Sequence, residues 1–184
     1  MLEYRPSSLE PVPEVVLVEG KSDFYLLRYC VDVLGLGPDV RLVPGTGAGS
    51  LDTPIRLYVG WGKSFLVLLD GDAEGLKQRE RYEALFGPVL RDTCVLLPEV
   101  CGDSLVLEVE GLLTPSDKPR IVNSILGPDA RATKKALHQS VQELFARGEA
   151  VELDSETRAR LEHLLSALSH RRAADGEQRP LREA

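Results

Sequence analysis

Two short apolar runs, each leading directly into acidic residues, constrain the fold of this chain more than any other feature. Residues 15–18 lead into Glu19 and Asp23, and residues 65–69 lead into Asp70 and Asp72. Each run is rich in valine and leucine and too short for an independent helix, so each predicts a buried strand. Uninterrupted apolar strands are typical of parallel sheets that are covered by helices on both faces.

The segments around these runs alternate between helix and strand patterns. Ser22 is expected to cap a helix that ends near Gly35. Further strands are expected at residues 40–43 and 93–97, the latter closed by Pro98, and further helices at residues 51–59 and 73–86. Four such alternations predict an α/β fold, a Rossmann-like parallel sheet of about four strands with helices on both faces.

Helix-forming residues dominate the second half of the chain. A C-terminal helical extension is expected over residues 114–169, with helices at about 132–147 and 155–169. Residues 1–13 contain three prolines and are interpreted as a linker. The polar residues 170–184 are predicted to be a disordered tail.

The acidic residues that follow the two strands predict a metal site. Carboxyl ends of parallel strands share one edge of a sheet, so these carboxylates converge and repel each other. Divalent cations with oxygen ligands, Mg²⁺ or Mn²⁺, relieve such repulsion. Two simpler interpretations stay open, because Asp70-Gly71-Asp72 suits an ordinary turn and Asp23 suits the positive end of a helix dipole.

Composition sets limits on function and location. The length of 184 residues suits one domain, and the net charge of -7 argues against coating nucleic acid through bulk basicity. Three cysteines without Cys-x-x-Cys spacing, and no signal peptide or membrane span, favour the cytoplasm. The three histidines, His138, His163 and His170, are scattered and predict no zinc site.

The first acidic motifs resemble a known family. Glu19-Gly20-Lys21-Ser22-Asp23 and Asp70-Gly71-Asp72 resemble the motifs of the Toprim domain, which topoisomerases, bacterial primases and several nucleases share. A glycine-rich stretch at residues 44–50 lies where Toprim domains often carry a glycine loop. The resemblance implies a Toprim catalytic domain over residues 14–113.

Later motifs resemble one branch, the overcoming-lysogenization-defect (OLD) nucleases, in residues 109–113, 115–117, 133–135 and 154–157. The resemblance implies DNA cleavage with two metal ions, and an extension that completes the site. Glu19 and Asp23 would hold one ion and Asp70 and Asp72 the other. Glu110 would join them, Glu108 is a possible helper, and Lys134 or Lys135 would meet the phosphate. Glu19, Lys134 and Lys135 are therefore the expected catalytic residues.

One departure from this branch concerns ATP. OLD nucleases carry an ATPase domain, whereas the loop at residues 45–51 lacks the Gly-Lys-Ser/Thr ending of a phosphate loop, so no nucleotide site is expected in this chain. An ATPase is expected in a longer protein or as a separate partner, and a homodimer stays open.

Three alternatives to a DNA nuclease remain at this point. They are a Toprim ribonuclease of the ribosomal-RNA maturation type, a non-catalytic nucleic-acid-binding module, and a receiver domain of the response-regulator kind. A receiver domain fits poorly with the helices that follow residue 114.

Overall fold

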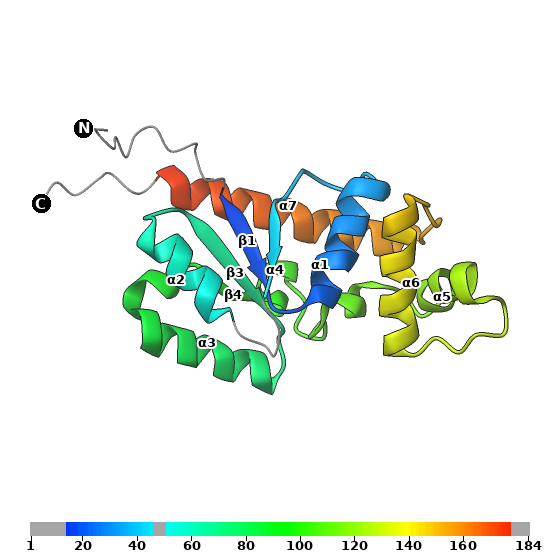
Figure 1. The fold of residues 1–184 in the computed structure, drawn as a ribbon, viewed down its shortest axis with the longest axis horizontal. Coiled ribbons are helices and arrows are strands. Elements are labelled where there is room, and N and C mark those ends of the chain that lie inside the picture. Colours follow the sequence, from blue (N-terminus) through cyan, green and yellow to red (C-terminus); the bar gives the residue numbers. More distant parts are fainter. Residues whose placement is uncertain (1–13, 46–50, 178–184) are drawn as a thin grey trace, which may run out of the picture.

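The computed structural model describes residues 14–45 and 51–177 and contains a four-stranded parallel sheet (Figure 1). The strands are β1 (Val15–Val18), β2 (Leu42–Pro44), β3 (Phe65–Leu69) and β4 (Cys94–Leu96), in the order β2-β1-β3-β4. All three strand pairs are parallel. The predicted α/β fold with a parallel sheet is confirmed.

Helices cover both faces of this sheet. Val16, Val18 and Leu66 point to the face that is covered by α1 (Lys21–Arg28) and α7 (Ser155–Glu177). Val15 and Leu17 point to the opposite face, which is covered by α2 (Asp52–Gly60) and α3 (Ala73–Phe86) (Figure 1). Burial on both faces explains why every position of β1 and β3 is apolar.

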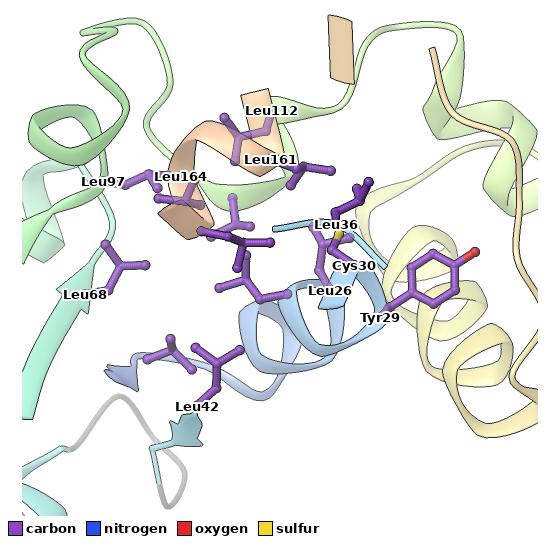
Figure 2. Close-up of a cluster of buried hydrophobic side chains, with 14 of the residues drawn as sticks. Leu26, Tyr29, Cys30, Leu36, Leu42, Leu68, Leu97, Leu112, Leu161 and Leu164 are labelled. Carbon is purple, nitrogen blue, oxygen red and sulfur yellow. The ribbon is translucent and has the colours of Figure 1, made fainter. Parts of the chain in front are cut away.

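The helical extension shares a core with the first of these faces. Leu161 and Leu164 of α7 are fully buried in the cluster that contains Leu68 of β3 and Leu26 of α1 (Figure 2). Each buried leucine contributes roughly 1.5–3 kcal/mol of transfer free energy. The extension is therefore packed against the sheet as part of the same body. The remaining elements are η2 (Tyr29–Val33), η3 (Gly87–Leu90), α4 (Leu97–Cys101), η4 (Val109–Leu112), α5 (Asp117–Leu126) and α6 (Lys134–Arg147).

Three local predictions need correction. Gly20, not Ser22, is the N-cap of α1. Strand β4 ends at Leu96, and Pro98 lies in the first turn of α4, where its missing N–H leaves no hydrogen bond unmade. Helix α7 continues to Glu177, past the expected start of the tail at residue 170, because no helix breaker occurs between residues 170 and 174.

Other predictions fall on parts of the chain outside the description. The proposed linker at residues 1–13, residues 46–50 of the glycine-rich loop and the last residues, 178–184, are among them. Within the described ranges, no helix combines the length and the apolar character that crossing a membrane requires.

The strand order creates a crevice between β1 and β3. The chain runs from β1 to β2 at one edge, then returns past β1 to β3. Connections on the two sides of this reversal lie on opposite faces of the sheet, which leaves a gap at the carboxyl ends of β1 and β3. Open α/β sheets bind their ligands at such switch points.

Close backbone approaches shape this edge. Gly75, in the first turn of α3, is so near the end of β3 that an added Cβ would lie 2.0 Å from the carbonyl oxygen of Asp70. The N–H of Gly71 donates to the carbonyl of Leu107 at 2.8 Å. This bond brings the segment that contains Glu108 and Glu110 to the end of β3.

The contact at Gly75 predicts a large cost for one methyl group. Gly75→Ala is expected to destabilise the fold by about 2 kcal/mol or more, because backbone has to move to admit the Cβ. Gly60→Ala is the matched control, since its Cβ would meet nothing within 4 Å. Alanine there is expected to be neutral or to stabilise the helix by up to about 1 kcal/mol. Urea unfolding of both variants measures the difference, and equal stability of the two would contradict the close approach.

Candidate metal centre

Glu19 and Asp70 lie at the carboxyl ends of the two central strands. Val18 of β1 pairs with Leu68 of β3, so the residues that follow the two strands emerge side by side. The backbone N–H of Asp70 hydrogen-bonds the Glu19 carboxylate. The Oε2 atom of Glu19 is buried and has no hydrogen-bond partner among the described residues. A buried carboxylate oxygen of this kind is costly unless a cation reaches it.

Asp23 joins this pair from the first turn of α1. Only two residues separate the end of β1 from the start of α1, which keeps the N-terminus of the helix at the same edge of the sheet. The Oδ2 atom of Asp23 accepts a hydrogen bond from the N–H of Gly20 at 3.1 Å. The side chain therefore also serves the helix start, as the simpler interpretation expected.

The segment after α4 and helix α6 complete the site. The Lys134 ammonium lies 2.8 Å from Glu108 Oε1 and 3.0 Å from Glu110 Oε1. The Nε2 atom of His138 lies 2.9 Å from the same oxygen of Glu110. Together these elements enclose a cavity of about 270 Å³, lined by Glu19, Gly20, Ser22, Asp23, Asp70, Glu110, Lys134 and His138.

The charges of this cavity are compensated unevenly. Burial, reinforced by the charges of Asp23, Glu19 and Glu110, raises the pKa of Asp70 to about 8. Burial and the charge of Glu110 raise the pKa of Asp23 to about 6, and burial raises that of Glu19. Burial also disfavours the charged form of Glu110, but the hydrogen bond from His138 and the contact with Lys134 outweigh it and lower its pKa to about 2. Positive charge is therefore lacking on the Asp70 side.

The other predicted residues lie around this cavity. Asp72 is the N-cap of α3, where its Oδ1 accepts from the N–H of Gly75 at 2.8 Å, and its charge raises the pKa of Glu19. It does not line the cavity. Glu108 is bound to Lys134 at the rim. Lys135 does not line this cavity; it lines an adjoining shallow groove along α6, together with Lys134, His138, Gln139 and Gln142.

Two residues that line the site, His138 and Ser22, were not expected there from the sequence. The Nδ1 atom of His138 lies 3.0 Å from Ser22 Oγ, so the hydroxyl that was expected to cap a helix contacts the ring instead. His138 follows Lys134 by four residues and therefore lies on the same face of α6. That spacing was the available signal, because a helix that brings Lys134 to the acids brings His138 with it.

Two later motifs of the sequence have a structural role instead. Asp117 is fully buried and accepts hydrogen bonds from Thr114 Oγ1 at 3.0 Å and from the N–H of Asp154 at 3.1 Å. Arg120 pairs with both aspartates. This network joins the start of α5 to the start of α7, and none of its residues lines the cavity.

The donors around the cavity fit a hard divalent cation. They are carboxylate oxygens, and within residues 14–45 and 51–177 one of them is buried without a hydrogen-bond partner and the Asp70 side has no cation beside it. Among the described residues, no group of three His, Cys, Asp or Glu side chains is already close enough to hold an ion. Binding therefore requires side chains to rotate toward the cavity.

Comparison with family models, curated proteins and solved structures finds no match to this chain.

The raised pKa of Asp70 predicts how stability depends on pH. The pKa of Asp70 is about 8 in the folded chain, whereas the ordinary pKa of an aspartate is 3.8. Protonation of Asp70 therefore contributes fully to the stability of the fold below about pH 4, and this contribution is lost as the pH rises toward 8. Without divalent ions, Asp70→Asn is expected to unfold at a higher temperature than the wild type at pH 8, by about 2–4 °C for each kcal/mol of relieved repulsion. The advantage is expected to shrink toward pH 4.

Asp117→Asn is the matched control for this experiment. Its carboxylate is paired, so the substitution leaves buried partners with weaker hydrogen bonds and is expected to cost about 1–3 kcal/mol. Thermal unfolding followed by circular dichroism measures both variants. An Asp70→Asn variant that is less stable than the wild type at pH 8 would show that the repulsion is absent.

Proposed function

We propose that this chain is the catalytic module of a metal-dependent endonuclease that hydrolyses phosphodiester bonds in DNA, with a Toprim-type domain of the OLD nuclease kind. The observation that carries the proposal is the convergence of Glu19, Asp23 and Asp70 at the switch point of a parallel sheet, opposite Lys134 in one cavity. Carboxylates in excess facing a lysine suit a substrate that arrives with negative charge and needs metal ions to neutralise it.

Mg²⁺ or Mn²⁺ is the proposed cofactor. Glu19, Asp23, Asp70 and Glu110 line the cavity and would hold it, while Asp72 and Glu108 lie next to them. Two ions, as the resemblance implies, remain part of the proposal. When bound, such ions lower the pKa of a coordinated water and stabilise charge on the leaving oxygen.

The residues of the chain position the reacting groups. Glu19 and Asp70 are fixed by adjacent strand ends, which gives the site a rigid base. Lys134 lies at the mouth of the cavity, with its side chain about half exposed. From there its ammonium can meet a phosphate oxygen that gains charge in the transition state. Bound cations would supply the local positive charge that a chain with a net charge of -7 lacks.

The wider setting is part of the same proposal. We propose an ATPase partner, either in a longer polypeptide or as a separate protein, because the OLD resemblance implies one. All three cysteines are free thiols, which agrees with the proposed cytoplasmic location. A homodimer is compatible with the proposal and is not required by it.

Nicking of supercoiled plasmid DNA with Mg²⁺ or Mn²⁺ tests the proposal. Asp70→Asn is expected to abolish measurable cleavage, and Lys134→Ala to lower the turnover rate about 10²–10³-fold, the usual cost of losing a group that stabilises transition-state charge. Lys135→Ala, the neighbouring lysine outside the cavity, is the matched control and is expected to lose far less.

The assay also separates the alternatives. Cleavage that continues in EDTA, or at the wild-type rate in Asp70→Asn, would contradict the proposal. A labelled RNA that is cut much faster than DNA of the same sequence would favour a Toprim ribonuclease. Binding of DNA without any cleavage would favour the non-catalytic module.

A further inference from the structure

His138 links three segments that are far apart in the sequence. Its ring stands on α6, with Nδ1 3.0 Å from Ser22 Oγ in the first turn of α1. Its Nε2 lies 2.9 Å from Oε1 of Glu110 in η4. The side chain of His138 is 19% exposed and that of Glu110 is 9% exposed, so water competes little for these hydrogen bonds. Both ring nitrogens are thus occupied by protein.

The chemistry of the three groups fixes the direction of these hydrogen bonds. Lys134 and His138 both contact Oε1 of Glu110, and a carboxylate that is paired with an ammonium group only accepts hydrogen bonds. The Nε2 atom of His138 therefore carries the hydrogen and donates it. In a neutral ring Nδ1 is then a bare acceptor, and only the Ser22 hydroxyl can supply the hydrogen between them.

We propose that Ser22 and His138 form a positioning relay that fixes the Glu110 carboxylate at the wall of the acidic cavity, with Nε2 of the ring donating its hydrogen to Glu110. The relay deepens the proposed function, since it assigns a support to one of the proposed metal ligands. Ligating carboxylates are commonly oriented by such hydrogen bonds from a second layer of residues.

In this relay, two residues of α6, Lys134 and His138, have different roles. Lys134 contacts Glu110 Oε1 at 3.0 Å, next to the His138 contact on the same oxygen. Lys134 also reaches Glu108 and is the more exposed of the two, with 56% of its side chain accessible. When a phosphate draws Lys134 toward itself, His138 still holds Glu110 in place. Lys134 then contacts the phosphate of the substrate, and His138 supports Glu110, the proposed metal ligand.

The first test needs no metal and no activity. Long-range ¹H–¹⁵N spectra of the full chain at pH 8 distinguish the two forms of each histidine ring, and the signals missing from His138→Gln identify His138. The relay predicts that Nε2 of His138 carries a hydrogen. A ring with Nδ1 protonated and Nε2 bare overturns it.

The second test measures the affinity for Mn²⁺ alone by titration calorimetry. His138→Ala is expected to weaken binding about 10–100-fold, the usual effect of losing such a support. His138→Gln places an amide N–H near the position of Nε2 and is expected to restore most of the affinity. Ser22→Ala is expected to weaken binding in the wild type but not in the His138→Gln background, because the two residues act through one chain of hydrogen bonds.

Thermal unfolding of each variant separates positioning from general stability. Equal loss of affinity in His138→Gln and His138→Ala, at similar melting temperatures, overturns the relay. If the wild-type chain binds no Mn²⁺, the proposed function fails, and the spectra still decide whether the relay exists.

Discussion

Mutual repulsion among carboxylates at one sheet edge is the constraint on which the rest of this structure depends. Glu19 and Asp70 are brought side by side by the pairing of β1 and β3, which the hydrophobic core enforces on both faces. Asp23 and Glu110 then approach from two further elements, and burial together with the neighbouring negative charges raises the pKa of Asp70 to about 8. The packing of the sheet therefore maintains an arrangement that the charges alone would disperse, a conflict typical of functional sites.

The negative charges of the carboxylates are balanced differently on the two sides of the cavity. Glu110 receives protein cations and donors, from Lys134 and His138, and stays ionised. Glu19 and Asp23 accept hydrogen bonds from backbone amides, and among the described residues Glu19 keeps a buried oxygen without a hydrogen-bond partner. The charge of Glu110 is thus balanced by residues of the chain, whereas the side of Glu19, Asp23 and Asp70 is suited to a cation from solution.

The same residue type serves a structural purpose elsewhere. Asp117 is more deeply buried than any acid of the cavity, yet each of its oxygens has a donor, and Arg120 balances its charge. The sequence of residues 115–117 and 154–157 resembles motifs of a nuclease family. In the structure these residues join α5 to α7. The number of partners around an acid, which sequence does not display, separates a structural acid from a functional one.

The strands and most helices followed from local patterns, because apolar runs in β1 and β3 and the 3.6-residue periodicity of the longer helices are recorded in the sequence itself. The boundaries at Ser22, Pro98 and residue 170 did not, since caps depend on which backbone groups find partners after folding. The grouping of Glu19, Asp23 and Asp70 was also predictable, because parallel strands end at one edge.

The sequence by itself determined the sheet and the acids at its edge, since both depend on spacing along a strand. Only the tertiary structure decided that Lys134 rather than Lys135 faces the acids, and that His138 connects Ser22 to Glu110. These contacts span up to 116 residues of sequence. They depend on the angle at which α6 packs against α1, and that angle is set by the shared core and by no local pattern.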